Sequence, residues 1–144
     1  MHHNTQTEPL EEMAASALRL GRNVVAMVRD LRPGADSHDA AFLQRCLAPL
    51  GDSRVFSRRY DGGFDTALTR LRALRDGEEI YRRRDFRGFL DPEGDDVGIV
   101  CETPVYTDRG DQLAALVEHL EAVIATRQSL FDRQAAERFL LGRT

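Results

Sequence analysis

The chain has neither lysine nor tryptophan, so arginine supplies all 20 of its basic side chains. Cysteine is nearly absent as well. Cys46 and Cys101 lie far apart, and no Cys-x-x-Cys pair or Cys and His cluster has the spacing of a zinc site. We therefore expect no metal, no cofactor and two thiols that are buried or idle. An oxidant sensor stays open as the alternative, which would require an exposed, activated thiolate.

Long apolar runs are missing too. No stretch is long enough to span a bilayer, and the polar N-terminal MHHNTQTEP lacks the apolar centre of a signal peptide. We expect a cytoplasmic protein with no membrane partner, whose residues 1–9 form a disordered tail.

Catalytic motifs are also absent, since the chain has no GxSxG, no HExxH and no glycine-rich phosphate loop. His38 beside Asp39 and His119 beside Glu118 are the nearest acid/base groups, but adjacent helical residues point to different faces. We expect no enzyme and no catalytic residues. A small-molecule-binding domain or minor enzyme stays open as a third alternative.

An acidic segment matches part of a calcium loop. Asp91, Glu93, Asp95 and Glu102 stand at positions one, three, five and twelve of an EF-hand pattern. Asp96 stands where that loop needs glycine, and no helices are expected on either side. We therefore expect no calcium site.

The composition is that of an ordinary folded protein, with 42% hydrophobic and 31% charged residues. The length of 144 residues is enough for one domain. Between residues 10 and 31 apolar side chains recur in steps of three and four, which predicts a helix that ends at Arg32-Pro33-Gly34. This stripe indicates either a helix partner from a second subunit or a core-facing helix. Its members are Leu10, Met13, Ala17, Leu20, Val24, Met27 and Leu31.

Three shorter helices are predicted next. Ser37 can cap a helix that runs to Leu47, residues 53–60 form a short helix, and Asp61-Gly62-Gly63 forms a turn. A further helix covers residues 64–75, with Asp65 as its N-cap or, as the alternative, as a contact to cytosine.

A β-hairpin and a long closing helix complete the chain. Residues 80–89 and 97–106 are two extended stretches around an acidic tip. After residues 107–111 another helical stripe begins, and it predicts a buried face. Its members are Leu113, Leu116, Leu120, Val123, Arg127 and Leu130, with Phe131, Ala135, Phe139 and Leu140 extending it.

Three segments resemble the MarR family of bacterial regulators: SRVFSRRYDGGFDTALTRLRAL its paired helices, EEIYRRR the start of its wing, and VYTDRGDQLAALVEHL its post-wing segment. The resemblance implies a mainly α fold with a small β-hairpin, a winged helix-turn-helix flanked by N- and C-terminal dimerisation helices. Residues 10–144 would form this single domain, with dimerisation helices at 10–32 and 111–142 and a DNA-binding core at 37–106.

Charge supports a local nucleic-acid surface on an otherwise acidic chain. Residues 54–87 hold ten arginines and six acids, so the local balance is 10 − 6 = +4 against a net charge of −4 for the chain. We expect a homodimer to bind a pseudo-palindromic site in double-stranded DNA, with base contacts from the helix at 64–75 and phosphate contacts around it. The expected DNA-binding residues are Ser53, Arg58, Arg59, Thr66, Thr69, Arg70, Arg82, Arg83, Arg84 and Arg87.

The acidic tip departs from the family pattern, where a wing arginine usually enters the minor groove. The resemblance further implies a small-molecule effector at the junction of the dimer helices and the winged helix, for which the candidate ligand-binding residues are Arg22, Phe42, Tyr106 and His119. The alternative function is a helical dimeric adaptor or antagonist that binds a protein partner, which the acidic balance and acidic tip favour.

Overall fold

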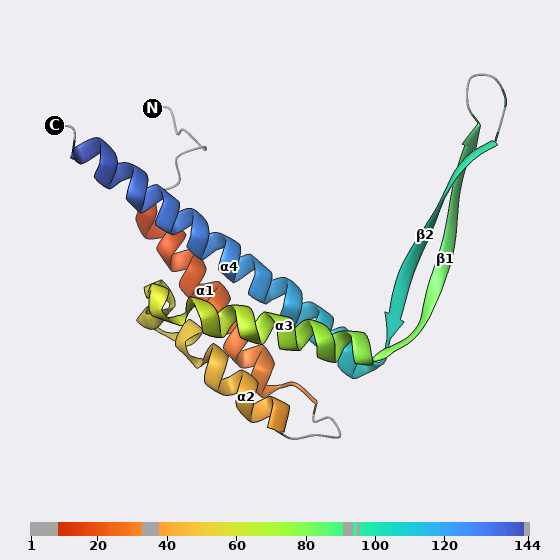
Figure 1. The fold of residues 1–144 in the computed structure, drawn as a ribbon, viewed down its shortest axis with the longest axis horizontal. Coiled ribbons are helices and arrows are strands. Elements are labelled where there is room, and N and C mark those ends of the chain that lie inside the picture. Colours follow the sequence, from red (N-terminus) through yellow and green to blue (C-terminus); the bar gives the residue numbers. More distant parts are fainter. Residues whose placement is uncertain (1–8, 33–37, 91–93, 95, 143–144) are drawn as a thin grey trace.

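The structure, a computed structural model, describes residues 9–32, 38–90, 94 and 96–142. It is mainly helical, with one two-stranded antiparallel hairpin, as the sequence predicts. The helices are α1 (Leu10–Arg29), α2 (His38–Leu47), α3 (Asp61–Gly77) and α4 (Asp108–Leu141), and three 3₁₀ turns lie between α2 and α3. Figure 1 shows α1 and α4 side by side, with α2 and α3 packed beneath them.

The stripe of α1 faces the core of its own chain. Ala17 and Val24 are fully buried, and Leu20, Met27 and Leu31 pack partly buried against the core cluster. Gly21 lies where the next segment crosses, because a Cβ there would sit 2.1 Å from the carbonyl oxygen of Leu50. Of the two interpretations of the stripe, the core-facing helix therefore accounts for most of it.

The segment between α2 and α3 corrects two predictions. Residues 53–60 are not an α-helix but two 3₁₀ turns, η2 (Ser53–Phe56) and η3 (Arg58–Tyr60), which follow η1 (Ala48–Gly51). The backbone is extended at Asp52 and Ser57, and their side chains accept hydrogen bonds from the amides of Arg54 and Arg59, so each short turn begins at its own cap.

The predicted turn at 61–63 is also wrong, because α3 begins at Asp61 and includes both glycines. Neither glycine has a positive φ, so nothing in the backbone interrupts the helix there. Asp65 is consequently an interior residue of α3 rather than its N-cap, and its carbonyl accepts a hydrogen bond from the Thr69 hydroxyl. The predicted cap of α2, Ser37, lies outside the described residues.

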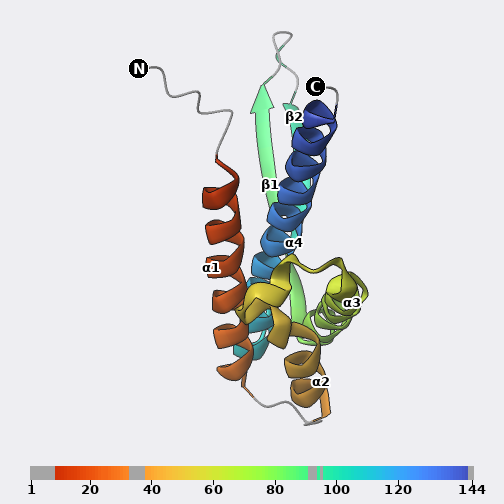
Figure 2. The ribbon, with the colours of Figure 1, turned by 90° about the vertical axis from the view of Figure 1, so that its left-hand side faces the viewer.

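The hairpin prediction is confirmed, with strands β1 (Glu79–Leu90) and β2 (Asp96–Tyr106) in antiparallel register and an irregularity between Glu79 and Tyr81. Figure 1 shows the hairpin and α4 diverging from a shared corner at residues 106–108, so the hairpin stands away from the helices. In Figure 2, turned by a quarter, the hairpin lies behind α4. Both faces of the hairpin are therefore exposed along most of its length.

The buried face of α4 is confirmed along its whole predicted stripe, including Arg127. Thr107 caps the helix by accepting a hydrogen bond from the amide of Gly110 at 3.1 Å. Beyond the buried Phe131, however, Ala135 and the end of the helix are exposed, and Phe139, Leu140 and Leu141 expose 61–72% of their surface. No helix in the described part of the chain is long and apolar enough to cross a membrane.

Candidate nucleic-acid interface

The exposed face of α3 carries two threonines, an arginine and an alanine. Thr66, Thr69, Arg70 and Ala73 lie along it and, with Phe42 of α2, line an open groove of about 380 Å³. The threonine hydroxyls donate to carbonyls one turn earlier, Thr66 to Gly62 at 2.7 Å and Thr69 to Asp65 at 3.0 Å. These bonds fix the two side chains on the outside of the helix, where each keeps acceptor capacity on its oxygen.

Arg70 is held by an ion pair that the sequence did not predict. Its guanidinium lies 2.7 Å from Oδ1 of Asp39, a largely buried carboxylate on α2, while about half of the arginine side chain stays exposed. The pair joins α2 to α3 across the groove. Arg70 therefore lies on the predicted face, but one edge of its guanidinium already contacts Asp39.

The 3₁₀ segment before α3 presents further predicted residues at the surface. Ser53 is exposed at the first position of η2, and Arg59 is exposed in η3. Arg58 lies over the ring of Phe131, 4.4 Å from its centroid. Neither Arg58 nor Arg59 makes an ion pair with the described residues, so both keep their charge available for a phosphate.

Arg127 supports this segment from below. It is 4% exposed, donates to the carbonyls of Val55 and Ser57, and pairs with Asp61 at 2.6 Å. Its guanidinium also lies over the ring of Phe64, 4.8 Å from the centroid. One buried cation thus ties η2, η3 and the start of α3 to α4. An arginine at a core position of an apolar stripe was the signal in the sequence, but its partners were not foreseeable.

Three of the four predicted hairpin arginines are neutralised within the hairpin. Arg82 pairs with Glu79 at 3.0 Å, Arg83 with Asp85 at 3.0 Å and Arg84 with Glu102 at 2.9 Å. Arg87 makes no ion pair with the described residues. Residues 79–106 hold four arginines and seven acids, a balance of 4 − 7 = −3. The hairpin therefore lacks the positive charge that a phosphate backbone would attract.

The base of the hairpin is clamped to the start of α4. Glu78 accepts hydrogen bonds from the hydroxyl of Thr107 at 2.6 Å and from Arg109 at 3.1 Å, and Arg109 also donates to the carbonyl of Arg32. These two donors, the hydroxyl first, lower the pKa of Glu78 below its ordinary value. Gly110 completes the contact, since a Cβ there would lie 2.5 Å from Cβ of Tyr106. The clamp fixes the direction in which the hairpin leaves the helices.

The four residues predicted to bind an effector lie on different elements. Arg22 on α1 donates to the carbonyl of Gly51, and Phe42 on α2 lines the groove described above. Tyr106 lies against Gly110 at the end of β2, and Nδ1 of His119 lies 2.8 Å from the carbonyl oxygen of Ala115 within α4. Each of the four thus has its own neighbours, and no described pocket is lined by more than one of them.

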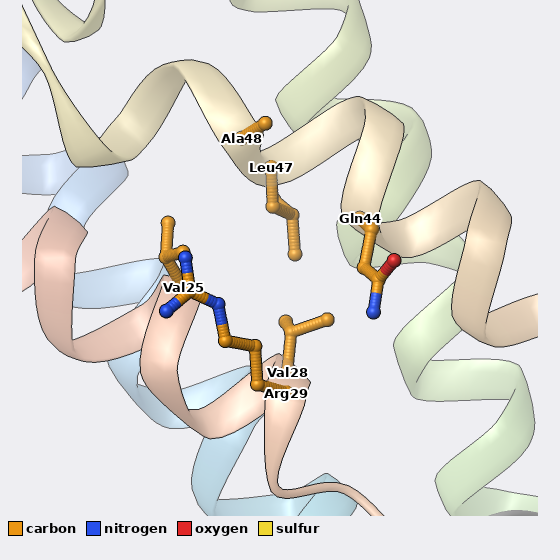
Figure 3. Close-up of a pocket in the computed structure, with 6 residues that line it drawn as sticks. All are labelled: Val25, Val28, Arg29, Gln44, Leu47 and Ala48. Atoms are coloured by element: carbon orange, nitrogen blue, oxygen red, sulfur yellow. The ribbon is translucent and has the colours of Figure 1, made fainter.

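A different pocket lies between α1 and α2. Its volume is about 220 Å³, and Figure 3 shows Val28 and Leu47 facing its centre, with Arg29 on one side and Gln44 on the other. An apolar centre with a guanidinium and an amide at the margin suits a small molecule that has both an apolar and a polar end. Sequence periodicity does not find this pocket, because Arg29 and Gln44 are ordinary exposed residues of their helices.

The two thiols lie in different environments, and most of the acidic segment lies outside the described residues. Burial raises the pKa of the partly buried Cys46, which opposes an activated thiolate, and Cys101 is exposed on β2. Glu102 lies on β2 in its pair with Arg84, whereas Asp91, Glu93 and Asp95 lie outside the described residues. Within the described ranges no three His, Cys, Asp or Glu side chains come together as metal ligands.

Comparison with protein families, with curated proteins and with solved structures finds no match to this chain. Its function has to be argued from the surfaces above.

Proposed function

We propose that the protein is a DNA-binding transcriptional regulator of the winged-helix type, with α3 as the recognition helix. The observation that carries this proposal is the exposed face of α3, where Thr66 and Thr69 stand beside Arg70 in a groove bordered by α2. A threonine methyl suits contact with the methyl of thymine, and a free edge of a guanidinium suits guanine.

The neighbouring charges support it. Residues 53–77 hold six arginines and three acids, a balance of 6 − 3 = +3, whereas the hairpin balance is −3. Phosphate contacts are therefore assigned to Arg58 and Arg59 in η3, with Ser53 at the edge of the same surface. The hairpin arginines, which we expected to bind DNA, are secondary in this proposal because three of the four are paired with carboxylates and the hairpin as a whole is acidic.

The proposal includes a homodimer on a pseudo-palindromic site, as the family resemblance implies. Support comes from the end of α4, where the apolar residues Phe139, Leu140 and Leu141 expose 61–72% of their surface. Most of α1 is used within its own chain, so the dimer contact is assigned to the end of α4 rather than to the stripe of α1. A small-molecule effector in the pocket between α1 and α2 would act by favouring one arrangement of these helices.

A protein-binding adaptor is the second candidate function. It is favoured by the hairpin, where paired arginines accompany apolar side chains that are more than half exposed, among them Ile80, Tyr81 and Ile99. The two candidates differ in one property, which is salt-dependent affinity for duplex DNA. Binding that prefers one sequence supports the regulator, and no preference over a scrambled duplex at low salt supports the adaptor.

A further inference from the structure

The hairpin exposes apolar surface that the proposed DNA contact does not use. Phe86 and Val100 are opposite each other in the register, and they expose 67% and 57% of their surface. A two-stranded hairpin without a covering layer is marginally stable in water. A partner surface that covers one face of the hairpin would therefore stabilise the hairpin.

One face of the hairpin carries an aromatic ring between two glycines. Strand alternation places Arg84, Phe86 and Gly88 on the same side, opposite Glu102, Val100 and Gly98. The ring of Phe86 lies over both glycines, since a Cβ on Gly88 or Gly98 would fall 2.4 Å and 2.0 Å from its ring atoms. The two positions without side chains thus let the aromatic ring lie along the strands. The Phe86 ring and Val100 thus form an apolar surface next to the Arg84–Glu102 ion pair.

The same face is self-complementary. Each of its three pairs joins β1 to β2 at one height, and in the ion pair the cation lies on β1 and the carboxylate on β2. A two-fold axis along the hairpin places β1 of one copy opposite β2 of the other. Arg84 then faces Glu102 of the second copy, and Phe86 faces its Val100. The pairing brings unlike charges together twice and covers both apolar side chains.

We propose that this hairpin face binds the same face of a second copy of the chain around that axis. If the contact runs along the full paired length of the strands, two such faces bury roughly 700 Å² in total, from a strand rise of ~3.3 Å per residue and a strand spacing of ~4.8 Å. This lies below the roughly 1,200 Å² of a stable complex, so the contact is reversible and concentration-dependent. It is separate from the end of α4 and does not depend on DNA binding.

The hairpin's position leaves room for this partner. Figure 1 shows α4 and the hairpin diverging from their common corner, and Arg84, Phe86 and Val100 are exposed. The clamp of Thr107 and Arg109 on Glu78 holds the hairpin in that direction. The partner copy therefore meets a surface that is already oriented.

A charge exchange between two variants of the full chain tests the proposal. In a dimer of the Arg84→Glu variant, the new carboxylate of each copy faces Glu102 of the other copy. In a dimer of the Glu102→Arg variant, the new guanidinium of each copy faces Arg84 of the other copy. Each variant alone should associate at least about ten-fold more weakly than the parent chain. In an equimolar mixture each carboxylate faces a guanidinium of the other chain, so association should return.

Sedimentation velocity over a range of concentrations up to tens of micromolar provides the mass of the largest species. At the highest concentration we expect that mass to be at least twice as large for the parent chain and for the mixture as for either variant alone, because each variant keeps at most the association through the end of α4. The mixture does not relieve repulsion inside either hairpin, so its recovery reports contact between chains. Arg83→Glu, a matched change on the opposite face, should associate like the parent chain, and circular dichroism checks that all variants are folded.

Three results would overturn the proposal: a parent chain that never gains mass, variants that associate as well as the parent, or a mixture no heavier than its components. The last result would point to pairing of strand edges or to a different protein partner. Loss of DNA binding alone would leave the proposal intact, because the mass is measured without DNA.

Discussion

The guanidinium of Arg127, buried on α4, donates to the carboxylate of Asp61, the first residue of α3, at 2.6 Å. The same group holds the carbonyls of Val55 and Ser57. The Arg127 guanidinium therefore holds η2, the backbone before η3 and the start of α3 together. The position of the candidate DNA-binding face depends on this buried residue.

Replacing this residue tests that dependence. Arg127→Ala should lower the free energy of unfolding by about 3 kcal/mol, because it leaves two carbonyls and one carboxylate without their donor. Chemical denaturation measures the change. Arg138→Ala, an exposed change on the same helix, should stay within about 0.5 kcal/mol of the parent chain. Equal effects for the two variants would contradict the role of Arg127.

Close packing of α1 against η1 predicts an effect at a glycine. Gly21→Ala should destabilise the fold by about 1–3 kcal/mol, because the new Cβ would lie 2.1 Å from a backbone oxygen that cannot rotate away. Gly77→Ala is the control, since a Cβ there meets nothing within 4 Å. It should leave stability unchanged or raise it slightly. Thermal unfolding compares them, and a neutral Gly21→Ala would contradict the packing.

The clamp at the hairpin base predicts a pH dependence. The pKa of Glu78 is lowered in the folded chain, so its contribution is complete above the ordinary value near 4.5 and is lost as pH falls through the lowered value. Glu78→Gln should be less stable than the parent chain at neutral pH, and the difference should shrink on acidification. Thermal unfolding from neutral to acidic pH measures it. A difference that does not change with pH would argue against the charged clamp.

Variants at the two ends of the Arg70–Asp39 ion pair distinguish a base contact by Arg70 from a purely structural link between α2 and α3. If its free edge contacts a base, Arg70→Ala should lose about 1–3 kcal/mol of discrimination between a specific and a scrambled duplex. Asp39→Asn should keep that discrimination, because the guanidinium is still present. Fluorescence anisotropy with both duplexes measures both variants. Equal loss in the two would mean that Arg70 acts only by joining α2 to α3.

The parts of the fold that periodicity controls were predictable. The stripe of α4 was correct even at Arg127, and the strands of the hairpin lie within about one residue of their predicted ends, because each pattern repeats over many residues. The segment 53–63 was not, because local caps at Asp52 and Ser57 and a distant arginine decide its geometry. A pair of glycines predicts a turn only when nothing else stabilises a helix there.

The candidate site was predictable only in part. The sequence gathers Thr66, Thr69 and Arg70 on one helix face, and periodicity is enough to show that. It does not show that Asp39 holds Arg70 or that Glu79, Asp85 and Glu102 neutralise three hairpin arginines, because these pairs depend on neighbouring elements and strand register. Counting charges along the chain therefore overestimated the positive charge that the hairpin presents.

The most direct test is the affinity of the purified chain, and of Arg59→Ala, for fluorescent duplexes from the DNA upstream of its own coding sequence. Measurements at two salt concentrations stand beside a scrambled duplex and the control Arg19→Ala, an exposed arginine on α1 outside the proposed DNA and dimer contacts. We predict tight, sequence-selective binding that weakens with salt, and for Arg59→Ala a similar loss on every duplex with a salt slope smaller by about one. Equal and weak binding of both duplexes at low salt, unchanged by Arg59→Ala, would contradict the assignment of α3 and η3 as a DNA-binding surface.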